Sequence, residues 1–335
     1  MAPLSVALGK FATRHPGPRT QRSGSSRTPA TLPLVTTQPA FTPPPNARAY
    51  SLDTSRGAFA VVDHPVAPGV EVRGTALLLP GFTGSKEDFT LMQEPLAARG
   101  YRTIAVDGRG QHESDGPEDD ESAYARGELA RDVLAQAEAL GARDTPLHLF
   151  GHSLGGQIAR AAVLIDHTPF RSLTLMASGP AQISDSQQQR VKLLRDALAV
   201  MTMAETWEAI RAMGPPEEVG GPAKGIGGQD LLRRRWMGTK PAQLLATGRQ
   251  LTTEPDRVDE LAALPLPFHV LSGASDDTWP VPVLDDMAAR LKARRTIIPG
   301  AEHSPNADQP LPTAEAVADF WDSVRETESD EGSDA

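Results

Sequence analysis

The sequence contains no cysteine. Disulfide bonds, thiolate nucleophiles and cysteine-ligated metals are therefore excluded. No run of apolar residues is long enough to cross a bilayer, so we expect no integral membrane segment. Positive charge is also scarce, because 33 lysines and arginines stand against 43 aspartates and glutamates, and the net charge of −10 argues against nucleic acid as the main partner. Since the start of the chain lacks the layout of a secretory signal, we expect a cytoplasmic protein.

The first 48 residues differ in composition from the rest of the chain. They hold nine prolines and six basic residues but no acidic residue. Because proline at this density breaks an amphipathic helix, a disordered extension over 1–48 is favoured over an organelle-targeting segment. The acidic residues 327–335 are expected to form a second disordered tail. One large domain remains between these two segments.

The next part of the chain alternates between short apolar runs and helical patterns. The strands are expected at 70–79, 103–106, 147–150 and 172–176, and the helices at 86–99, 122–140 and 154–166. The first strand has an alternative interpretation as the second arm of a hairpin. This order predicts a mostly parallel, doubly wound α/β sheet with helices on both faces.

The alternation stops at residue 183. Mainly helical patterns with glycine- and proline-rich breaks fill residues 183–264. The elements beyond them are strands at 268–271 and 296–298 and a last helix over 313–325. We therefore predict a core of residues 49–182 and 265–326. Residues 183–264 would form a helical cap inserted after the strand at 172–176, which is taken as the sixth strand of the sheet. Such an insertion would cover the carboxyl edge of the sheet, where ligands bind in open α/β folds.

A glycine-flanked serine follows the apolar run at 147–150. The sequence Gly-His-Ser-Leu-Gly-Gly at 151–156 predicts a tight turn from strand to helix. Gly151 and Gly155 supply the positions without a Cβ that such a crowded turn needs. The turn would expose the Ser153 hydroxyl above the sheet and aim helix N–H groups at the same point. Ser153 is therefore the candidate nucleophile.

A serine nucleophile needs a general base. His303 is the best candidate, because it lies in the loop directly after the last predicted strand, at the sheet edge where ligands bind. His112 lies in another loop near the site and is kept as a secondary candidate. His148 and His269 lie inside apolar strands, so we expect them in the core.

The histidine needs a carboxylate to fix its tautomer and stabilise its charged form. Asp276 and Asp277 follow the strand at 268–271, and either could reach the loop of His303. We place Asp276 first because it precedes Pro280 by four residues. The other aspartate would then serve as a turn or helix cap.

The oxyanion formed by serine attack needs two hydrogen-bond donors. We expect the first to be the backbone N–H of Leu154 and the second to be that of Phe82, in the glycine-rich loop 79–84. Pro80 has no N–H, which leaves Phe82 as the less contested donor of that loop. The residues that we expect to line the site next to these groups are Gly81, His112, His152, Asp277 and Trp279.

Five segments in this order resemble the α/β-hydrolase superfamily. They are LLLPGFTGS (77–85), AVDGRGQHES (105–114), LFGHSLGGQIA (149–159), LSGASDDTWP (271–280) and IPGAEHSP (298–305). The order serine, acid, histidine along the chain is also that of the superfamily. The resemblance implies that Ser153 is the nucleophile, Asp276 the acid and His303 the base, with Phe82 and Leu154 as oxyanion donors. It does not extend to the cap.

These residues predict a serine hydrolase that cleaves a carboxylic ester through an acyl-enzyme, without a metal or organic cofactor. Thioesterase, lactonase, C–C hydrolase and perhydrolase chemistry on the same triad are alternatives that the fold does not separate. A non-catalytic ligand-binding member of the fold is the alternative from another class. The expected partner is a small-molecule ester or related acyl compound, and the oligomeric state stays open. Six residues of the cap could line an apolar pocket, although we expect several of them to form cap core instead. They are Met201, Met203, Trp207, Met213, Trp236 and Met237.

Overall fold

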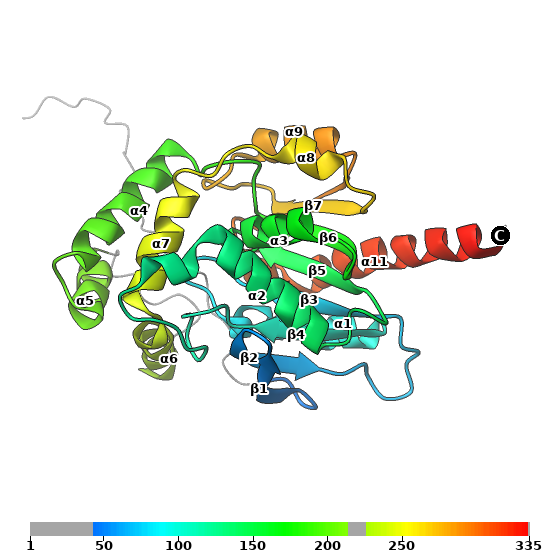
Figure 1. The fold of residues 1–335 in the computed structure, drawn as a ribbon, viewed down its shortest axis with the longest axis horizontal. Coiled ribbons are helices and arrows are strands. Elements are labelled where there is room, and N and C mark those ends of the chain that lie inside the picture. The colour runs from blue at the N-terminus through cyan, green and yellow to red at the C-terminus, as the bar shows by residue number, and fades with distance from the viewer. Residues whose placement is uncertain (1–42, 214–225, 334–335) are drawn as a thin grey trace, which may run out of the picture. The chain divides into compact units, whose positions relative to one another are not determined.

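A computed structural model describes residues 43–213 and 226–333. The strands of this part are β1 (Arg48–Thr54), β2 (Gly57–His64), β3 (Gly74–Leu79), β4 (Tyr101–Val106), β5 (Leu147–His152), β6 (Phe170–Met176), β7 (Phe268–Gly273) and β8 (Arg294–Ile298). They form one sheet in the order β1-β2-β4-β3-β5-β6-β7-β8 (Figure 1). The strands β3 to β8 run parallel to one another, and the β1–β2 hairpin joins β4 in antiparallel fashion.

Helices cover both faces of this sheet. One face carries α1 (Thr90–Ala98) and α11 (Pro310–Ser333), and the other carries α2 (Arg126–Ala139), α3 (Leu154–Ile165) and α9 (Val281–Leu291). Side chains alternate along β3, so that Ala76 and Leu78 pack on the first side and Leu77 and Leu79 on the second. Burial on both faces explains the unbroken apolar runs of the sequence. The predicted doubly wound sheet is confirmed.

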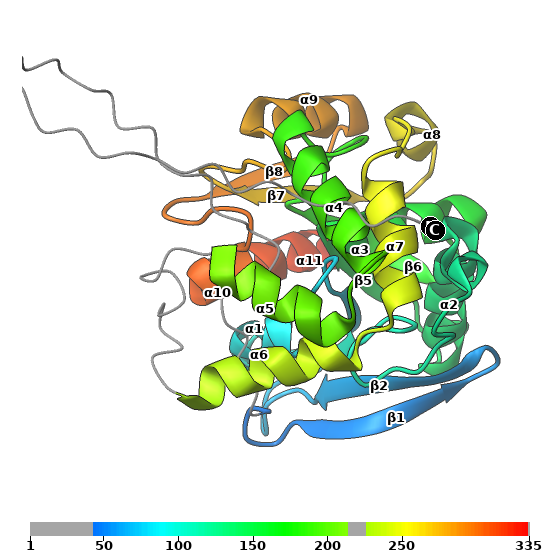
Figure 2. The same ribbon diagram turned by 90° about the vertical axis from the view of Figure 1, so that its left-hand side faces the viewer.

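The helices α4 (Asp185–Leu198), α5 (Met203–Met213), α6 (Ile226–Gly238), α7 (Pro241–Leu251) and α8 (Val258–Ala262) lie between β6 and β7 in the chain. The insertion after the sixth strand is therefore confirmed. The first four gather at one end of the sheet, where α4 lies beside α7 and α5 beside α6 (Figures 1 and 2). The short helix α8 packs instead against α9 and α3. The limits 183–264 of the cap stay a prediction.

The strand predicted over 70–79 begins only at Gly74. It pairs in parallel with β4 and β5, so the alternative interpretation as a hairpin arm is wrong. The hairpin lies earlier in the chain, in β1 and β2. Neither strand of this hairpin was predicted from the sequence. β1 lies at the edge of the sheet with most of its side chains exposed, which removes its apolar signal, whereas β2 is buried along most of its length.

Both predicted disordered ends need a correction. Residues 1–42 lie outside the described residues, but Arg48 already pairs with β2 as the first residue of β1. At the other end, α11 continues to Ser333, through most of the predicted tail 327–335. A helix that is already formed extends without a new nucleation step, and glutamate favours helix. Residues 334–335 lie outside the described part.

Among the helices of the described ranges, none is both long enough and apolar enough to span a membrane.

Candidate active site

Ser153 occupies a strained turn between β5 and α3. Its φ of 53° lies in a region that side chains rarely adopt. A Cβ on Gly151 would lie 2.5 Å from the backbone of Gly155, and a Cβ on Gly155 would lie 2.4 Å from the carbonyl oxygen of Leu79. Both positions therefore require glycine, for the reason that the sequence indicated. The turn sets Ser153 at the carboxyl end of β5.

The structure brings Ser153, His303 and Asp276 into one row. The Nε2 atom of His303 lies 3.1 Å from the Oγ atom of Ser153. The Nδ1 atom of His303 lies 3.0 Å from each carboxylate oxygen of Asp276. Because an ionised carboxylate only accepts hydrogen bonds, Nδ1 carries the proton and Nε2 can accept the bond from the serine hydroxyl.

Two backbone groups orient the carboxylate of Asp276. Its Oδ1 atom accepts hydrogen bonds from the N–H of Thr278 at 2.8 Å and from that of Trp279 at 3.1 Å. Its side chain is fully buried, whereas 21% of the His303 side chain is exposed. Burial lowers the pKa of His303, but the carboxylates of Asp276, Asp277 and Asp308, led by Asp276, together outweigh this effect and hold that pKa above its ordinary value of 6.5.

Asp277 points toward the cap. Its Oδ2 atom accepts a hydrogen bond from Nε2 of Gln187 at 2.7 Å and lies 3.4 Å from Nη1 of Arg190, both on α4. Its backbone carbonyl accepts a hydrogen bond from the Ser184 hydroxyl at 2.7 Å. Of the two aspartates that the sequence left open, Asp276 is the one hydrogen-bonded to His303, and Asp277 ties its loop to α4.

The loop 81–84 lies against the serine. A Cβ on Gly81 would lie 3.4 Å from the Cβ of Ser153. Leu154 is the first residue of α3, so its N–H has no acceptor within the helix. No hydrogen-bond acceptor for the Phe82 N–H lies among the described residues. Both predicted donors are therefore without a backbone partner in the part of the chain that the structure describes.

The side chain of Gln111 fixes the loop 81–84 through hydrogen bonds. Its Nε2 atom donates to the carbonyl oxygen of Gly81 at 2.9 Å, and its Oε1 atom accepts from the N–H of Gly108 at 3.0 Å. Its side chain is buried. Its partner Gly81 lies 30 residues away along the chain. Nothing in the local sequence pointed to this contact.

His152 supports the loop of His303. Its Nε2 atom donates a hydrogen bond to the backbone carbonyl oxygen of His303 at 2.9 Å. Full burial lowers the pKa of His152 to about 3, so the ring is neutral at physiological pH. The two residues are 151 positions apart, and sequence reasoning therefore missed this contact. His148 and His269 lie in the core, as predicted.

Trp279 lies beside the histidine. Its ring centroid is 6.2 Å from that of His303. Its Nε1 atom donates to the carbonyl oxygen of Ala181 at 3.0 Å, and a Cβ on Gly179 would collide with its ring at 2.1 Å. The buried indole thus lies between His303 and the segment 179–181, which leads into the cap.

His112, the secondary base candidate, faces other groups. Its Nε2 atom lies 3.8 Å from a carboxylate oxygen of Glu87 and 3.9 Å from one of Glu113. Its backbone N–H donates to the hydroxyl of Thr239 in the cap at 3.3 Å. Burial lowers the pKa of its imidazole. The atom that contacts the Ser153 hydroxyl belongs instead to His303.

Within the described ranges, Glu87, His112 and Glu113 form one group whose ligand atoms lie within 4.8 Å of one another and could hold a metal ion. The ammonium group of Lys86 already lies among these carboxylates, 2.8 Å from Glu87 and 2.7 Å from Glu113. It also lies 2.9 Å from Asp107. Because this internal cation compensates the acidic charge, we assign the group to stability of the loop rather than to metal binding.

The comparison with known families agrees with the fold. The sequence profile described as the Alpha/beta hydrolase family matches residues 76–316. The chain belongs to the alpha/beta hydrolase family. This hydrolase is 28% identical over 188 residues to pimeloyl-[acyl-carrier protein] methyl ester esterase of Aeromonas hydrophila subsp. hydrophila. The match covers 52% of this chain and 69% of that protein.

One further sequence relative and one solved structure are also similar to this hydrolase. It is 28% identical over 235 residues to the non-heme haloperoxidase of Rhodococcus erythropolis, with 67% of this chain and 83% of that protein covered. The structure of a thermophilic esterase from Thermogutta terrifontis matches with a TM-score of 0.61 at 21% identity, covering 83% of this chain and 100% of that one. The predicted α/β-hydrolase fold is therefore confirmed.

Proposed function

We propose that this hydrolase cleaves carboxylic esters through a Ser-His-Asp acyl-enzyme mechanism. The observation that carries the proposal is the continuous row of hydrogen bonds from Ser153 through His303 to Asp276. Such a row activates a serine hydroxyl, which is a poor nucleophile on its own. The esterase among the sequence relatives supports an ester as the substrate class.

In the first step, Nε2 of His303 accepts the proton of the Ser153 hydroxyl, and Oγ attacks the ester carbonyl carbon. The carbonyl oxygen becomes negatively charged and accepts hydrogen bonds from the N–H groups of Phe82 and Leu154. Asp276 keeps the Nδ1–H tautomer of the imidazole and stabilises its charged form.

The tetrahedral intermediate then collapses. The C–O bond to the alcohol breaks, and the imidazolium of His303 gives its proton to the leaving oxygen. A water molecule next loses a proton to His303 and attacks the acyl-enzyme, which releases the carboxylic acid and restores Ser153. Burial of Asp276 and the partial exposure of His303 suit these roles, because the base must meet substrate and water.

The test is the hydrolysis of p-nitrophenyl butyrate together with labelling by a fluorophosphonate. Ser153→Ala should lower kcat by at least about 10⁴-fold and abolish labelling. His303→Ala should do the same, whereas Ser186→Ala, on α4, is the control and should change neither. An unlabelled Ser153 in a protein that binds small ligands tightly would favour the non-catalytic alternative.

A second candidate is perhydrolysis, favoured by the relative named a non-heme haloperoxidase. Here hydrogen peroxide would replace water in the second step, and the acyl group would leave as a peracid on the same three residues. Formation of peracid from an ester and hydrogen peroxide, lost in Ser153→Ala, would support this reaction. The names of the two sequence relatives favour neither thioesterase, lactonase nor C–C hydrolase chemistry.

A further inference from the structure

Trp279 joins the loop 274–280, which we call the acid loop, to the segment that leads into the cap. Its backbone N–H donates a hydrogen bond to Oδ1 of Asp276 at 3.1 Å, and its indole Nε1 donates to the carbonyl oxygen of Ala181 at 3.0 Å. Only 1% of Trp279 is exposed, so almost none of its surface is left for a substrate. The effect of this side chain on the proposed reaction must therefore pass through the groups that it contacts.

The carbonyl oxygen of Ala181 also binds the helix that begins beside the nucleophile. Nε2 of Gln157 donates to this oxygen at 3.1 Å. Gln157 lies one turn along α3, where its N–H donates to the carbonyl oxygen of Ser153 at 3.3 Å, and its side chain is fully buried. A carbonyl oxygen has two lone pairs, so it can accept both bonds. Ala181 thus links the helix of Ser153 to the acid loop.

The segment before Ala181 leaves room for the indole because residue 179 is glycine. A Cβ on Gly179 would lie 2.1 Å from Cδ1, 2.4 Å from Cγ and 2.6 Å from Nε1 of Trp279. Any side chain at this position would therefore displace the ring or the segment. Gly179 is not among the residues with positive φ, so the demand for glycine comes from the ring and not from the backbone.

The segment also holds the second N–H group that orients the Asp276 carboxylate. Thr278, whose N–H donates to Oδ1 of Asp276 at 2.8 Å, accepts a hydrogen bond at its carbonyl oxygen from the N–H of Ser184 at 2.9 Å. Ala177 has a φ of 46°, which a residue with a side chain keeps only where its surroundings enforce it. Both N–H groups on Asp276 therefore belong to residues that are anchored on the segment 177–184.

We infer that Trp279 is a positioning residue, whose indole anchors the acid loop on the segment 177–184 and so keeps the Asp276 carboxylate directed at Nδ1 of His303. This inference rests on the proposed ester hydrolysis. Without the indole N–H, the acid loop gains freedom to move. The carboxylate then holds the Nδ1–H tautomer and the charged form of His303 less well.

A displaced Asp276 should alter the acid–base behaviour of His303. Burial lowers the pKa of His303, and the Asp276 carboxylate is the strongest of the groups that raise it. Of the other groups nearby, Asp308 lies outside the acid loop, and Asp277 is held by α4. The ring of His152 is uncharged, because burial lowers its pKa to about 3. A lowered pKa of His303 therefore reports the position of Asp276.

The experiment measures the hydrolysis of p-nitrophenyl butyrate by Trp279→Phe over a range of pH. Phenylalanine keeps an aromatic ring but has no N–H for the carbonyl oxygen of Ala181. The kcat should fall by about 10- to 100-fold and KM should change less than about threefold, because the reacting groups are misplaced while the substrate still binds. The acid midpoint of kcat/KM should move below that of the wild-type protein, in the direction expected of Asp276→Asn.

Gly179→Ala tests the same contact from the other side. The added methyl group would displace the indole while Trp279 keeps its N–H, so kcat and the acid midpoint should change as in Trp279→Phe. Trp279→Ala removes the ring altogether, and adding Gly179→Ala to it should lower kcat by less than about twofold more. Losses that multiply in this double variant would contradict the contact on which the inference depends. Thermal unfolding of each variant reports its folding.

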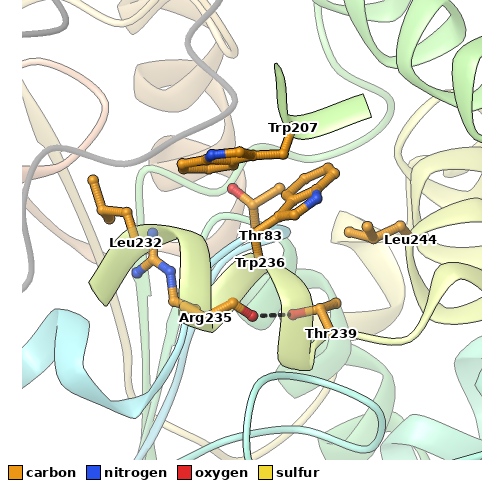
Figure 3. A pocket seen from close by; sticks show the side chains of 7 residues that line it. All are labelled: Thr83, Trp207, Leu232, Arg235, Trp236, Thr239 and Leu244. Carbon is orange, nitrogen blue, oxygen red and sulfur yellow. Dashed lines mark hydrogen bonds between the residues drawn. The ribbon is translucent and has the colours of Figure 1, made fainter. Parts of the chain in front are cut away.

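Two other buried tryptophans provide matched controls. Trp236 of α6 lies beside Trp207 of α5 (Figure 3), and its Nε1 donates to the carbonyl oxygen of Met203 at 2.7 Å. Trp236→Phe thus removes the same kind of hydrogen bond, but one between two helices of the cap. Trp321 of α11 stacks on the ring of His148 in the core, with centroids 4.9 Å apart. Trp236→Phe and Trp321→Phe should lower the temperature of thermal unfolding and leave the acid midpoint unchanged.

Two results would overturn the inference. One is a Trp279→Phe variant with the acid midpoint of the wild-type protein, even if its kcat is lower, because general loosening of the site also lowers activity. The other is an equal shift of the midpoint in either control variant. Both results leave Ser153-dependent hydrolysis standing. If the wild-type protein hydrolyses no ester and Ser153 is not labelled by a fluorophosphonate, the proposed function itself fails, and the positioning role fails with it.

Discussion

His152 donates a hydrogen bond from Nε2 to the backbone carbonyl oxygen of His303 at 2.9 Å, and the two rings lie 5.3 Å apart. His152 directly precedes Ser153 at the end of β5. The strand that carries the serine therefore also holds the loop that carries the histidine. Because the bond reaches a backbone atom, it fixes the position of this loop and leaves both ring nitrogens of His303 to Ser153 and Asp276.

The first prediction concerns this positioning bond. His152→Phe fills the buried space but removes the donor, so the His303 loop should move and kcat should fall by about 10- to 100-fold, with KM little changed. His152→Gln keeps an N–H group and should recover most of the loss. Steady-state kinetics on p-nitrophenyl butyrate check this. Equal activity of the two variants, with unchanged thermal unfolding, would contradict a positioning role.

The second prediction separates the two aspartates. Asp276→Asn removes the acceptor that holds the Nδ1–H tautomer of His303, and kcat should fall by about 10³- to 10⁴-fold. Asp277→Asn is the matched control, because it changes the same group one residue away. Its Oδ2 accepts from Gln187 of the cap, so turnover should fall less than tenfold. A larger loss in Asp277→Asn than in Asp276→Asn would reverse the assignment.

The third prediction concerns pH. Neutral His303 is the proposed base, so activity should be lost as pH falls through the pKa of this residue. Burial lowers that pKa, but the nearby carboxylates, led by Asp276, outweigh it and hold the pKa above 6.5. The midpoint of the acid limb of kcat/KM should therefore lie above pH 6.5. His152 does not contribute to this limb, since burial lowers its pKa to about 3.

A carboxylate variant tests the cause of this raised pKa. Without the charge of Asp276, only the carboxylates of Asp277 and Asp308 oppose the effect of burial, so the pKa of His303 should fall. The residual activity of Asp276→Asn should therefore have its acid midpoint below that of the wild-type protein. Two outcomes would contradict a histidine base paired with this carboxylate. In one, Asp276→Asn moves the acid midpoint upward. In the other, activity stays constant down to strongly acid pH.

The fourth prediction concerns stability at the joint between cap and core. Arg235 on α6 and Asp88 beside the loop 81–84 lie 2.7 Å apart, with only 4% and 2% of their side chains exposed. Arg235→Met leaves the Asp88 carboxylate buried without this partner and should lower the free energy of unfolding by about 3–5 kcal/mol. Adding Asp88→Asn removes the buried charge and should recover part of that loss. Urea unfolding measures the free energy of unfolding of both variants. A loss below about 1 kcal/mol in Arg235→Met would be too small for a buried ion pair.

The local sequence determined the fold class and the serine turn. Unbroken apolar runs occur where strands are covered on both faces, and the steric demand for glycine at Gly151 and Gly155 is a property of the turn itself. Both signals are contained within a few consecutive residues. Both strands of the β1–β2 hairpin and the helical continuation to Ser333 were missed; β1 carried no such signal because it is exposed.

Only the tertiary structure decided which aspartate meets His303, because Asp276 and Asp277 are neighbours and differ only in the direction of their side chains. The contacts of His152 and Gln111 were equally hidden from the sequence. These arrangements join segments that lie tens to hundreds of positions apart. Their geometry follows from how the core packs, and residue spacing along the chain does not encode it.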